Sequence, residues 1–337
     1  MSNLKDVARL AAVSIATVSR VINNYPLVDP ETRTRVQNAI RKLNFHPNRV
    51  ARRLSKLRMK EGNGKIIGLV LPDISNPFYV DVLRGVEDYA LKHEYVVITC
   101  NFGQDASREK HYLSILQSES IDGLVVVPVR GLDEEVSKMV ESGLPIVCVD
   151  RELSGTDVDV VLVDNRKGAY EAVQHLIRLG HKRIAFISGL PQIPTSIERL
   201  NGYKDALQAH KIPVDEKLVK YGNSMHESGL RLSEELLKSK PLPTALFTGN
   251  NLITLGALEM IHRLGLSIPG DIALVGFDDM HWSISLNPPL TAVRQPGYDI
   301  GTRATELLFQ RIADMKRPTA KVIFNAELKI RNSCGSA

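Results

Sequence analysis

The sequence has few cysteines, few aromatic residues and no long apolar run. Its three cysteines, Cys100, Cys148 and Cys334, are far apart and lack the close spacing of metal ligands. We interpret them as ordinary thiols and expect neither a metal site nor a cofactor. No run of 18 or more apolar residues and no signal-peptide pattern occur. The sequence therefore predicts a cytoplasmic protein without a membrane segment.

Signatures of common enzyme classes are also missing. No GxGxxG motif follows the first predicted strand, and neither GxxxxGK[ST] nor HExxH occurs. The nine histidines are scattered and have no obvious nucleophile as partner. We therefore predict that the protein is not an enzyme.

Positive charge is concentrated at one end of the chain. Residues 1–60 contain 13 lysines and arginines and three acidic residues, a net charge of +10 within a chain of net charge +5. The remaining residues therefore carry a net charge of −5. A basic head on a mildly acidic body indicates a polyanionic partner for the head alone.

The head has the apolar periodicity of three short helices. Residues 4–11 place their apolar side chains on one face, Ser14 can cap a second helix over 15–23, and Asp29 with Pro30 begins a third that reaches Leu43. The break of three or four residues between the first two helices is typical of a helix-turn-helix. On the polar face of the second helix, short hydroxyls can reach phosphates and Arg20 can present a fork to a guanine edge.

These residues resemble a known family. LKDVARLAAVSIATVSRVIN, followed by VDPETRTRVQNAIRKLNFHPNRVARRL, is similar to the DNA-binding head of the LacI/GalR family of bacterial transcription regulators. One departure is Ala12, where the family usually has glycine in the turn. The resemblance implies an all-α helix-turn-helix DNA-binding domain over residues 1–45 and a dimer that binds a pseudo-palindromic operator on double-stranded DNA with a central CG step.

The resemblance also implies a hinge helix and linker over residues 46–64. Val50, Leu54 and Leu57 would form a thin apolar seam on this basic segment, and Leu54 matches the leucine that wedges into the minor groove. Ile15 and Ala16 match the positions that vary operator preference. The implied DNA-binding residues are Ser14, Ile15, Ala16, Thr17, Ser19, Arg20, Asn23, Asn48, Ala51 and Leu54.

The body, residues 65–337, alternates short β-branched runs with helix-sized segments. Runs such as IIGLVL (66–71), RIAFIS (183–188) and IALVGFD (272–278) are typical of parallel strands buried on both faces. The resemblance implies an α/β periplasmic-binding-protein type I body with two doubly wound lobes. We expect an N-lobe at about 65–163 and 293–319 and a C-lobe at about 164–292 and 320–335, with crossovers near 164, 292 and 319.

Polar side chains follow several of these runs at the carboxyl ends of the predicted strands, where open α/β sheets bind ligands. Carboxylates, amides and an arginine beside an aromatic ring suit a polyhydroxylated ligand. The resemblance maps a small-molecule effector site onto Asn76, Phe78, Asp150, Thr195, Arg199, Asn250 and Asp278.

Two departures from the family leave the identity of the effector open. The chain has Asn250-Asn251 where the family commonly has Asn-Asp, and Ser224 lies nearest the place of an aromatic lid. No leucine heptads follow KIRNSCGSA, which favours a homodimer over a tetramer.

The most consistent interpretation is a dimeric repressor gated by a sugar or sugar derivative. The alternative within the family is a catabolite-control-type regulator gated by a protein partner. A transport solute-binding protein is disfavoured by the basic head.

Overall fold

A computed structural model describes residues 4–22, 25, 28–43, 65–103, 105–119, 121–128 and 133–335 of the chain. The chain divides into two compact units, residues 1–64 and 65–337, in agreement with the expected start of the body at residue 65. Each unit is described by itself. The predicted hinge helix, with Asn48, Ala51 and Leu54, lies outside the described residues, as does Asn23.

The head contains the three expected helices, α1 (Leu4–Ala11), α2 (Ile15–Ile22) and α3 (Pro30–Lys42). Asp29 caps α3, because its carboxylate accepts a hydrogen bond of 2.9 Å from the Thr32 amide. Apolar side chains from all three helices form one small core, whose buried members are Val7, Ala8, Ala11, Val18, Val21, Val36 and Ala39. The predicted helix-turn-helix is therefore confirmed.

The turn between α1 and α2 contains a backbone conformation that favours glycine. Ala12 has a φ angle of 52°, in the left-handed region. In this region the Cβ of an L-residue crowds the following carbonyl, which costs about 1–2 kcal/mol. The family's usual glycine avoids this cost, so the alanine found here strains the turn.

The N-lobe is a six-stranded sheet with strand order β11-β5-β4-β3-β1-β2. All five pairings in it are parallel. Its strands are β1 (Ile66–Leu71), β2 (Val96–Asn101), β3 (Gly123–Val126), β4 (Ile146–Val149), β5 (Asp159–Val163) and β11 (Lys321–Phe324). The helices of this lobe are α5 (Pro77–Lys92), α6 (Ala106–Ser118), α7 (Asp133–Glu141) and α12 (Gly297–Ala313).

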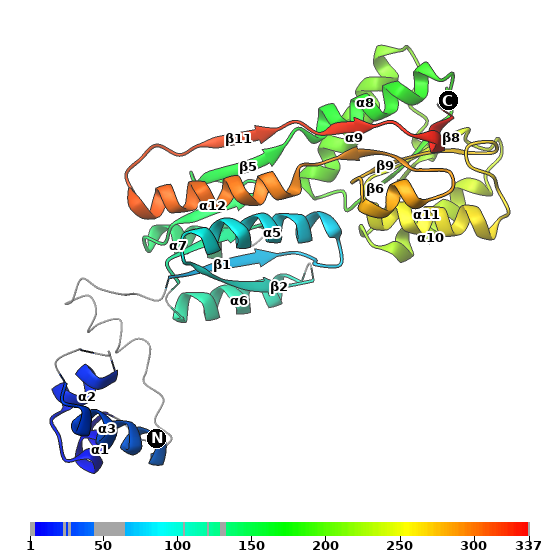
Figure 1. Cartoon of the computed structure of the whole chain (residues 1–337). Helices are drawn as coiled ribbons and strands as arrows, with labels where there is room; N and C mark the ends of the chain where they lie inside the picture. The colour runs from blue at the N-terminus through cyan, green and yellow to red at the C-terminus, as the bar shows by residue number, and fades with distance from the viewer. Residues whose placement is uncertain are drawn as a thin grey trace. The chain divides into compact units, whose positions relative to one another are not determined.

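The helices α5 and α12 lie side by side on the N-lobe (Figure 1). Glycine makes this close approach possible. A Cβ at Gly85 would collide with the Tyr298 carbonyl oxygen, and one at Gly301 would collide with the Val82 carbonyl oxygen. The α12 segment, late in the sequence, is thereby held against α5 near the start of the body.

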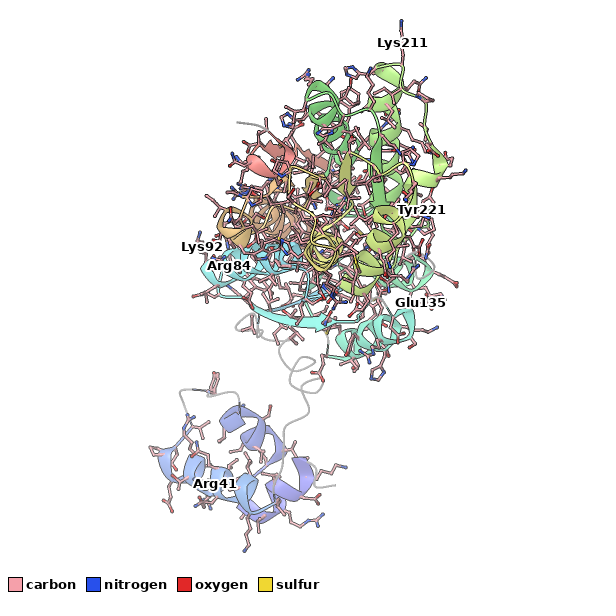
Figure 2. All side chains as sticks on the ribbon, turned by 90° about the vertical axis from the view of Figure 1, so that its right-hand side faces the viewer. Arg41, Arg84, Lys92, Glu135, Lys211 and Tyr221 are labelled. Carbon is pink, nitrogen blue, oxygen red and sulfur yellow. The ribbon has the colours of Figure 1, made fainter. Side chains whose placement is uncertain are left out.

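The C-lobe is a second six-stranded sheet with strand order β12-β10-β9-β8-β6-β7. Its strands are β6 (Ile184–Ser188), β7 (Val219–Tyr221), β8 (Ala245–Thr248), β9 (Ala273–Phe277), β10 (Thr291–Arg294) and the antiparallel β12 (Glu327–Lys329). Its helices are α8 (Asn165–Arg178), α9 (Pro194–Ala209), α10 (His226–Leu237) and α11 (Asn251–Arg263). The 3-10 turns are η1 (Glu216–Leu218), η2 (His281–Ser285) and η3 (Asn332–Cys334). Figure 2 shows Lys211, just after α9, projecting from the surface of this lobe.

The first crossover lies at Asp164, between β5 and α8, as expected. The second lies between Arg294 and Gly297, because β10 pairs with β9 in the C-lobe. The expected third crossover near residue 319 is wrong. Residues 321–324 form β11, which pairs with β5 in the N-lobe, so the chain crosses between Phe324 and Glu327.

Candidate functional site

The second helix of the head has one buried face and one solvent-exposed face. Val18 and Val21 are buried in the core, whereas Ile15, Ala16 and Arg20 are exposed to solvent. A side chain that is exposed on a helix held rigidly by its opposite face is available to a partner. The structure therefore places the predicted base-reading residues on the accessible side of α2.

Ser14 also has a structural role at the start of this helix. The Thr17 amide donates to Ser14 Oγ at 3.1 Å, and the two hydroxyl oxygens lie 2.9 Å apart. Ser14 is therefore the N-cap that the sequence predicts. Ser19 is half-buried on the same helix.

The body contains a cleft that both lobes line. Every effector-site residue predicted from the sequence lines it: Asn76, Phe78, Asp150, Thr195, Arg199, Asn250 and Asp278. These residues come from the ends of strands and the starts of helices on both sheets. We call this cavity the deep cleft. Its free volume is about 50 Å³, room for a few water molecules, so a larger ligand enters only if the lobes separate.

Asp150 is held in a strained turn at the end of β4. Its φ angle is 67°, and the Arg151 amide donates to the Val149 carbonyl oxygen at 2.7 Å, which closes a tight γ-turn around it. Asp278, with φ of 74°, and Ser224, with φ of 67°, adopt the same left-handed region in the cleft. Such strain costs of order 1–3 kcal/mol per residue and is typical of binding sites.

A buried tyrosine supports the Asp150 carboxylate. The Tyr79 hydroxyl donates to Asp150 Oδ2 at 3.2 Å. Burial raises the pKa of the Tyr79 phenol, so it stays protonated and remains a donor. The Arg151 Nε lies 3.4 Å from the same oxygen without hydrogen-bond geometry, and it has no hydrogen-bond partner among the described residues.

Arg199 is fixed in place by the C-lobe. Its Nε donates to Asn165 Oδ1 at 2.8 Å and its Nη1 donates to the Gly249 carbonyl oxygen at 2.5 Å. The guanidinium lies over the Phe277 ring, 3.8 Å from the ring centroid. This arrangement pre-orients a planar set of donors, which suits hydroxyl or carboxylate oxygens of a ligand.

Asp278 is a buried carboxyl beside this arginine. Gln295 Nε2 donates to its Oδ1 at 2.5 Å. Burial raises the pKa of the Asp278 carboxyl, although the Arg199 charge and the Gln295 hydrogen bond act in the opposite direction. A hydroxyl group entering the deep cleft would give this carboxyl a further donor.

Both the oxygen and the nitrogen of the Asn250 side chain make hydrogen bonds within the C-lobe. Its Oδ1 accepts from the Ile253 amide at 2.8 Å as the N-cap of α11, and its Nδ2 donates to the Ser224 carbonyl oxygen at 2.9 Å. The neighbouring Asn251 crosses the cleft instead, since its Nδ2 donates to Asn76 Oδ1 at 2.7 Å.

Thr195 and Phe78 complete the walls of the cleft. Thr195 lies in the first turn of α9, whose N-cap residue Ile193 provides no side-chain hydrogen bond. The Phe78 ring packs at 60° against the Tyr79 ring with centroids 5.1 Å apart. An aromatic face beside carboxylates and amides is the usual environment of a sugar ring.

Several residues that line the deep cleft lie outside the predicted effector site, among them Tyr79, Arg151 and Gln295. The sequence does place Arg151 directly after a predicted strand, although the family pattern does not include it. Tyr79 lies inside a helix, and Gln295 follows β10, a strand that the apolar runs did not reveal.

Among the described residues, no group of three metal-binding side chains gathers, and no helix there is long and apolar enough to span a membrane.

Comparisons with known proteins agree with this architecture. A family model described as "Bacterial regulatory proteins, lacI family" matches residues 3–48. A second, "Periplasmic binding proteins and sugar binding domain of LacI family", matches residues 64–332.

Named relatives match over most of their length. The chain is 38% identical to catabolite control protein A of Priestia megaterium over 90% of each chain. It is 34% identical to the HTH-type transcriptional repressor PurR of Aliivibrio salmonicida (strain LFI1238) over 93% of each chain. A solved structure titled "transcriptional regulator CelR-cellobiose complex" is 31% identical, covers 99% of this chain and 100% of its own, and gives a TM-score of 0.75.

The helix-turn-helix head and the two-lobed body define a transcription regulator that binds DNA, and the relatives are named as regulators rather than as enzymes. Within this class, the chain belongs to the LacI family of bacterial regulatory proteins. The resemblance noted from the sequence is thereby confirmed.

Proposed function

We propose that the protein is a homodimeric repressor of a pseudo-palindromic operator, gated by a sugar or sugar derivative bound in the deep cleft. The observation that carries this proposal is the convergence of Asp150 and Asn76 from the N-lobe with Arg199 and Asp278 from the C-lobe on one cavity. A ligand that contacts both lobes stabilises one arrangement of them over the others, and this differential affinity can couple the cleft to the head.

The chemistry of the cleft supports a polyhydroxylated effector. Three carboxyls, two arginines and amide side chains offer hydrogen bonds of both polarities, and Phe78 offers an apolar face. The solved regulator titled as a cellobiose complex shows that a protein of this fold and similar length holds a sugar. We expect no cofactor to be needed.

A second copy of the chain is the partner that the body surface favours. β2 is an edge strand of the N-lobe sheet, and its Val96 is 62% exposed. Leu91 at the end of α5 is 74% exposed. Exposed apolar residues at a sheet edge are stabilised by pairing with another chain, and a symmetric operator requires a symmetric dimer.

The test is selection of bound duplexes from a random DNA pool, with and without a mixture of sugars. We expect a palindrome to be enriched and its recovery to change with the sugars. An Arg20→Ala variant should lose the enrichment while its body still binds ligand. No enriched palindrome would overturn the DNA-binding part of the proposal.

A second candidate is gating by a protein partner, which the similarity to catabolite control protein A favours. The selection experiment distinguishes gating by a sugar from gating by a protein. A palindrome that is enriched to the same extent with and without every sugar would support the protein partner. Thermal unfolding of the protein with the same sugars provides an independent check, since a ligand that binds only the folded state raises the melting temperature.

A further inference from the structure

The first residue of the body, Lys65, is bound to the far end of helix α5. Its Nζ donates to the His93 carbonyl oxygen at 2.9 Å and to Glu94 Oε2 at 3.0 Å. The same ammonium lies 5.5 Å from the centroid of the Tyr95 ring. Because His93 is the C-cap of α5, the positive charge also lies at the helix end that stabilises a cation. We call this arrangement the Lys65 clamp.

Backbone hydrogen bonds fix the direction in which the chain enters the body. The Val96 amide donates to the Lys65 carbonyl oxygen at 2.8 Å, and the Ile66 amide donates to Asp122 Oδ2 at 3.0 Å. Both the backbone and the side chain of Lys65 are therefore bound to the short segment that joins α5 to β2.

Glu94 has an unfavourable backbone conformation in this segment. Its φ angle is 63°, in the left-handed region, where glycine avoids the crowding of a Cβ. Its side chain is 85% exposed, so burial does not account for a large residue here. The hydrogen bond from Lys65 lowers the pKa of the Glu94 carboxyl, so the pair is charged at neutral pH. Backbone strain at a residue whose side chain forms an ion pair points to a role for that ion pair.

The other end of α5 lines the deep cleft. Asn76 caps the helix and accepts the hydrogen bond from Asn251 of the C-lobe, and Tyr79 donates to Asp150. The 16 residues of α5 span about 24 Å between the cleft and the clamp. A helix packed along its length against α12 moves as one piece, so a shift of its first turn also moves its last turn.

We infer that Lys65 is a positioning residue that transmits the arrangement of the lobes to the segment leading to the head. A change at the deep cleft moves α5, α5 moves the clamp, and the clamp redirects the chain where the body begins. This inference rests on the proposed function, because it takes the cleft to gate operator binding. Without the clamp, the body and the head would keep their own folds, but operator affinity would no longer follow the state of the cleft.

The test is a set of double-mutant cycles in operator affinity, measured by fluorescence anisotropy with the duplex that the selection enriches. Asn251→Ala and Asn76→Ala disturb the cleft end of α5, and each should change the operator affinity of the otherwise unaltered protein about fivefold. In a Lys65→Met background, the same substitutions should change it less than about twofold. Lys65→Arg keeps the charge and the donors, so it should retain most of the response.

Two further variants separate this role from a general effect on stability. Lys110→Met is the matched control, because it removes an exposed ion pair with Glu135 on the same lobe and should leave the response to the cleft variants intact. Glu94→Gly relieves the backbone strain, so the body should resist urea at least as well as the parent protein, yet the response should fall as in Lys65→Met. A purely structural role would instead make the response follow the stability of the body.

The possible outcomes separate the inference from the proposed function. Equal effects of the cleft variants with and without Lys65→Met, or a full response in Glu94→Gly, would overturn the inference alone. If neither Asn251→Ala nor Asn76→Ala changes the operator affinity of the otherwise unaltered protein, the cleft does not gate operator binding. In that case the proposed gating fails together with the inference.

Discussion

Asn251 Nδ2 in the C-lobe donates to Asn76 Oδ1 in the N-lobe, and the two atoms are 2.7 Å apart. Both residues are buried, with exposed fractions of 1% and 8%. The same Asn76 oxygen accepts from the Phe78 amide at 2.9 Å, so it caps α5 and bonds across the cleft at once. The family commonly has aspartate at the position of Asn251. A carboxylate has no amide donor, so this chain has a lobe-to-lobe hydrogen bond that an aspartate could not make.

We expect Asn251→Ala to loosen the closed arrangement of the lobes. Loss of one hydrogen bond removes about 1 kcal/mol from the closed state, equivalent to about fivefold tighter binding of a ligand that must separate the lobes to fit the deep cleft. Small-angle scattering of the ligand-free variant should give a larger radius of gyration than the parent protein. Asn201→Ala on α9 is the matched control. An unchanged scattering profile together with unchanged affinity would show that the bond does not hold the lobes.

Replacement of Ala12 by glycine should stabilise the head. The left-handed conformation of Ala12 costs about 1–2 kcal/mol, of which the greater freedom of glycine in the unfolded chain offsets about 0.5–1 kcal/mol. We therefore expect a net gain of about 0.5–1 kcal/mol, measured as slower hydrogen exchange of the α1 and α2 amides. Ala11→Gly, one residue earlier in a helical and buried position, should have the opposite effect. Faster exchange in Ala12→Gly would contradict the prediction.

The sequence predicted those strands that are buried on both faces. β6, β8 and β9 are buried along their whole length, so each is a continuous apolar run that periodicity recognises. β11 instead alternates exposed and half-buried residues at the edge of the N-lobe sheet, and its four residues contain Lys321. Its apolar run, residues 322–324, is only three residues long, too short for periodicity to identify the strand that carries the chain past residue 319 in the N-lobe.

The cleft residues could be predicted where they directly follow an apolar run, as Asp150 and Asp278 do. Tyr79 could not, because its position inside α5 gives it the pattern of an ordinary core residue. The bond between Asn76 and Asn251 was also beyond sequence reasoning. It depends on how closely the two lobes approach, which no local pattern encodes.

Arg199→Ala should abolish the response to the effector while the body stays folded. The substitution removes the hydrogen bonds to Asn165 and Gly249 and the stacking on Phe277, a loss of about 2–4 kcal/mol in unfolding free energy. Arg199→Lys keeps the charge but loses the planar fork, so it should also bind ligand more weakly. Calorimetry and urea unfolding together measure both effects.

The control for this pair of variants is Arg166→Ala. Arg166 is exposed on the neighbouring α8 and pairs with Asp205 at the surface, where an ion pair contributes little to stability. It should leave ligand binding and unfolding nearly unchanged. Arg199→Ala with a normal response to ligand would mean that the effector does not occupy the deep cleft.

Asp278 should make the stability of the body depend on pH in the direction opposite to an ordinary surface aspartate. Burial raises its folded-state pKa above 3.8, so its contribution to stability is complete below that pH and is lost as pH rises through the raised value. Asp278→Asn is neutral at every pH, and its Oδ1 can still accept from Gln295. The stability of this variant relative to the parent protein should therefore increase as pH rises from about 4, and then level off.

Urea unfolding across this pH range measures the difference, and Asp105→Asn is a control of opposite sign. Asp105 is an exposed N-cap whose pKa is lowered, chiefly by the hydrogen bond from the Ser107 side chain, so its contribution is present above pH 3.8 and is lost as pH falls. Asp105→Asn should therefore be less stable than the parent protein at neutral pH, and this difference should shrink toward acid pH. If Asp278→Asn followed the same course, the Asp278 carboxyl would be stabilised in its charged form by Arg199, and burial would not dominate its ionisation.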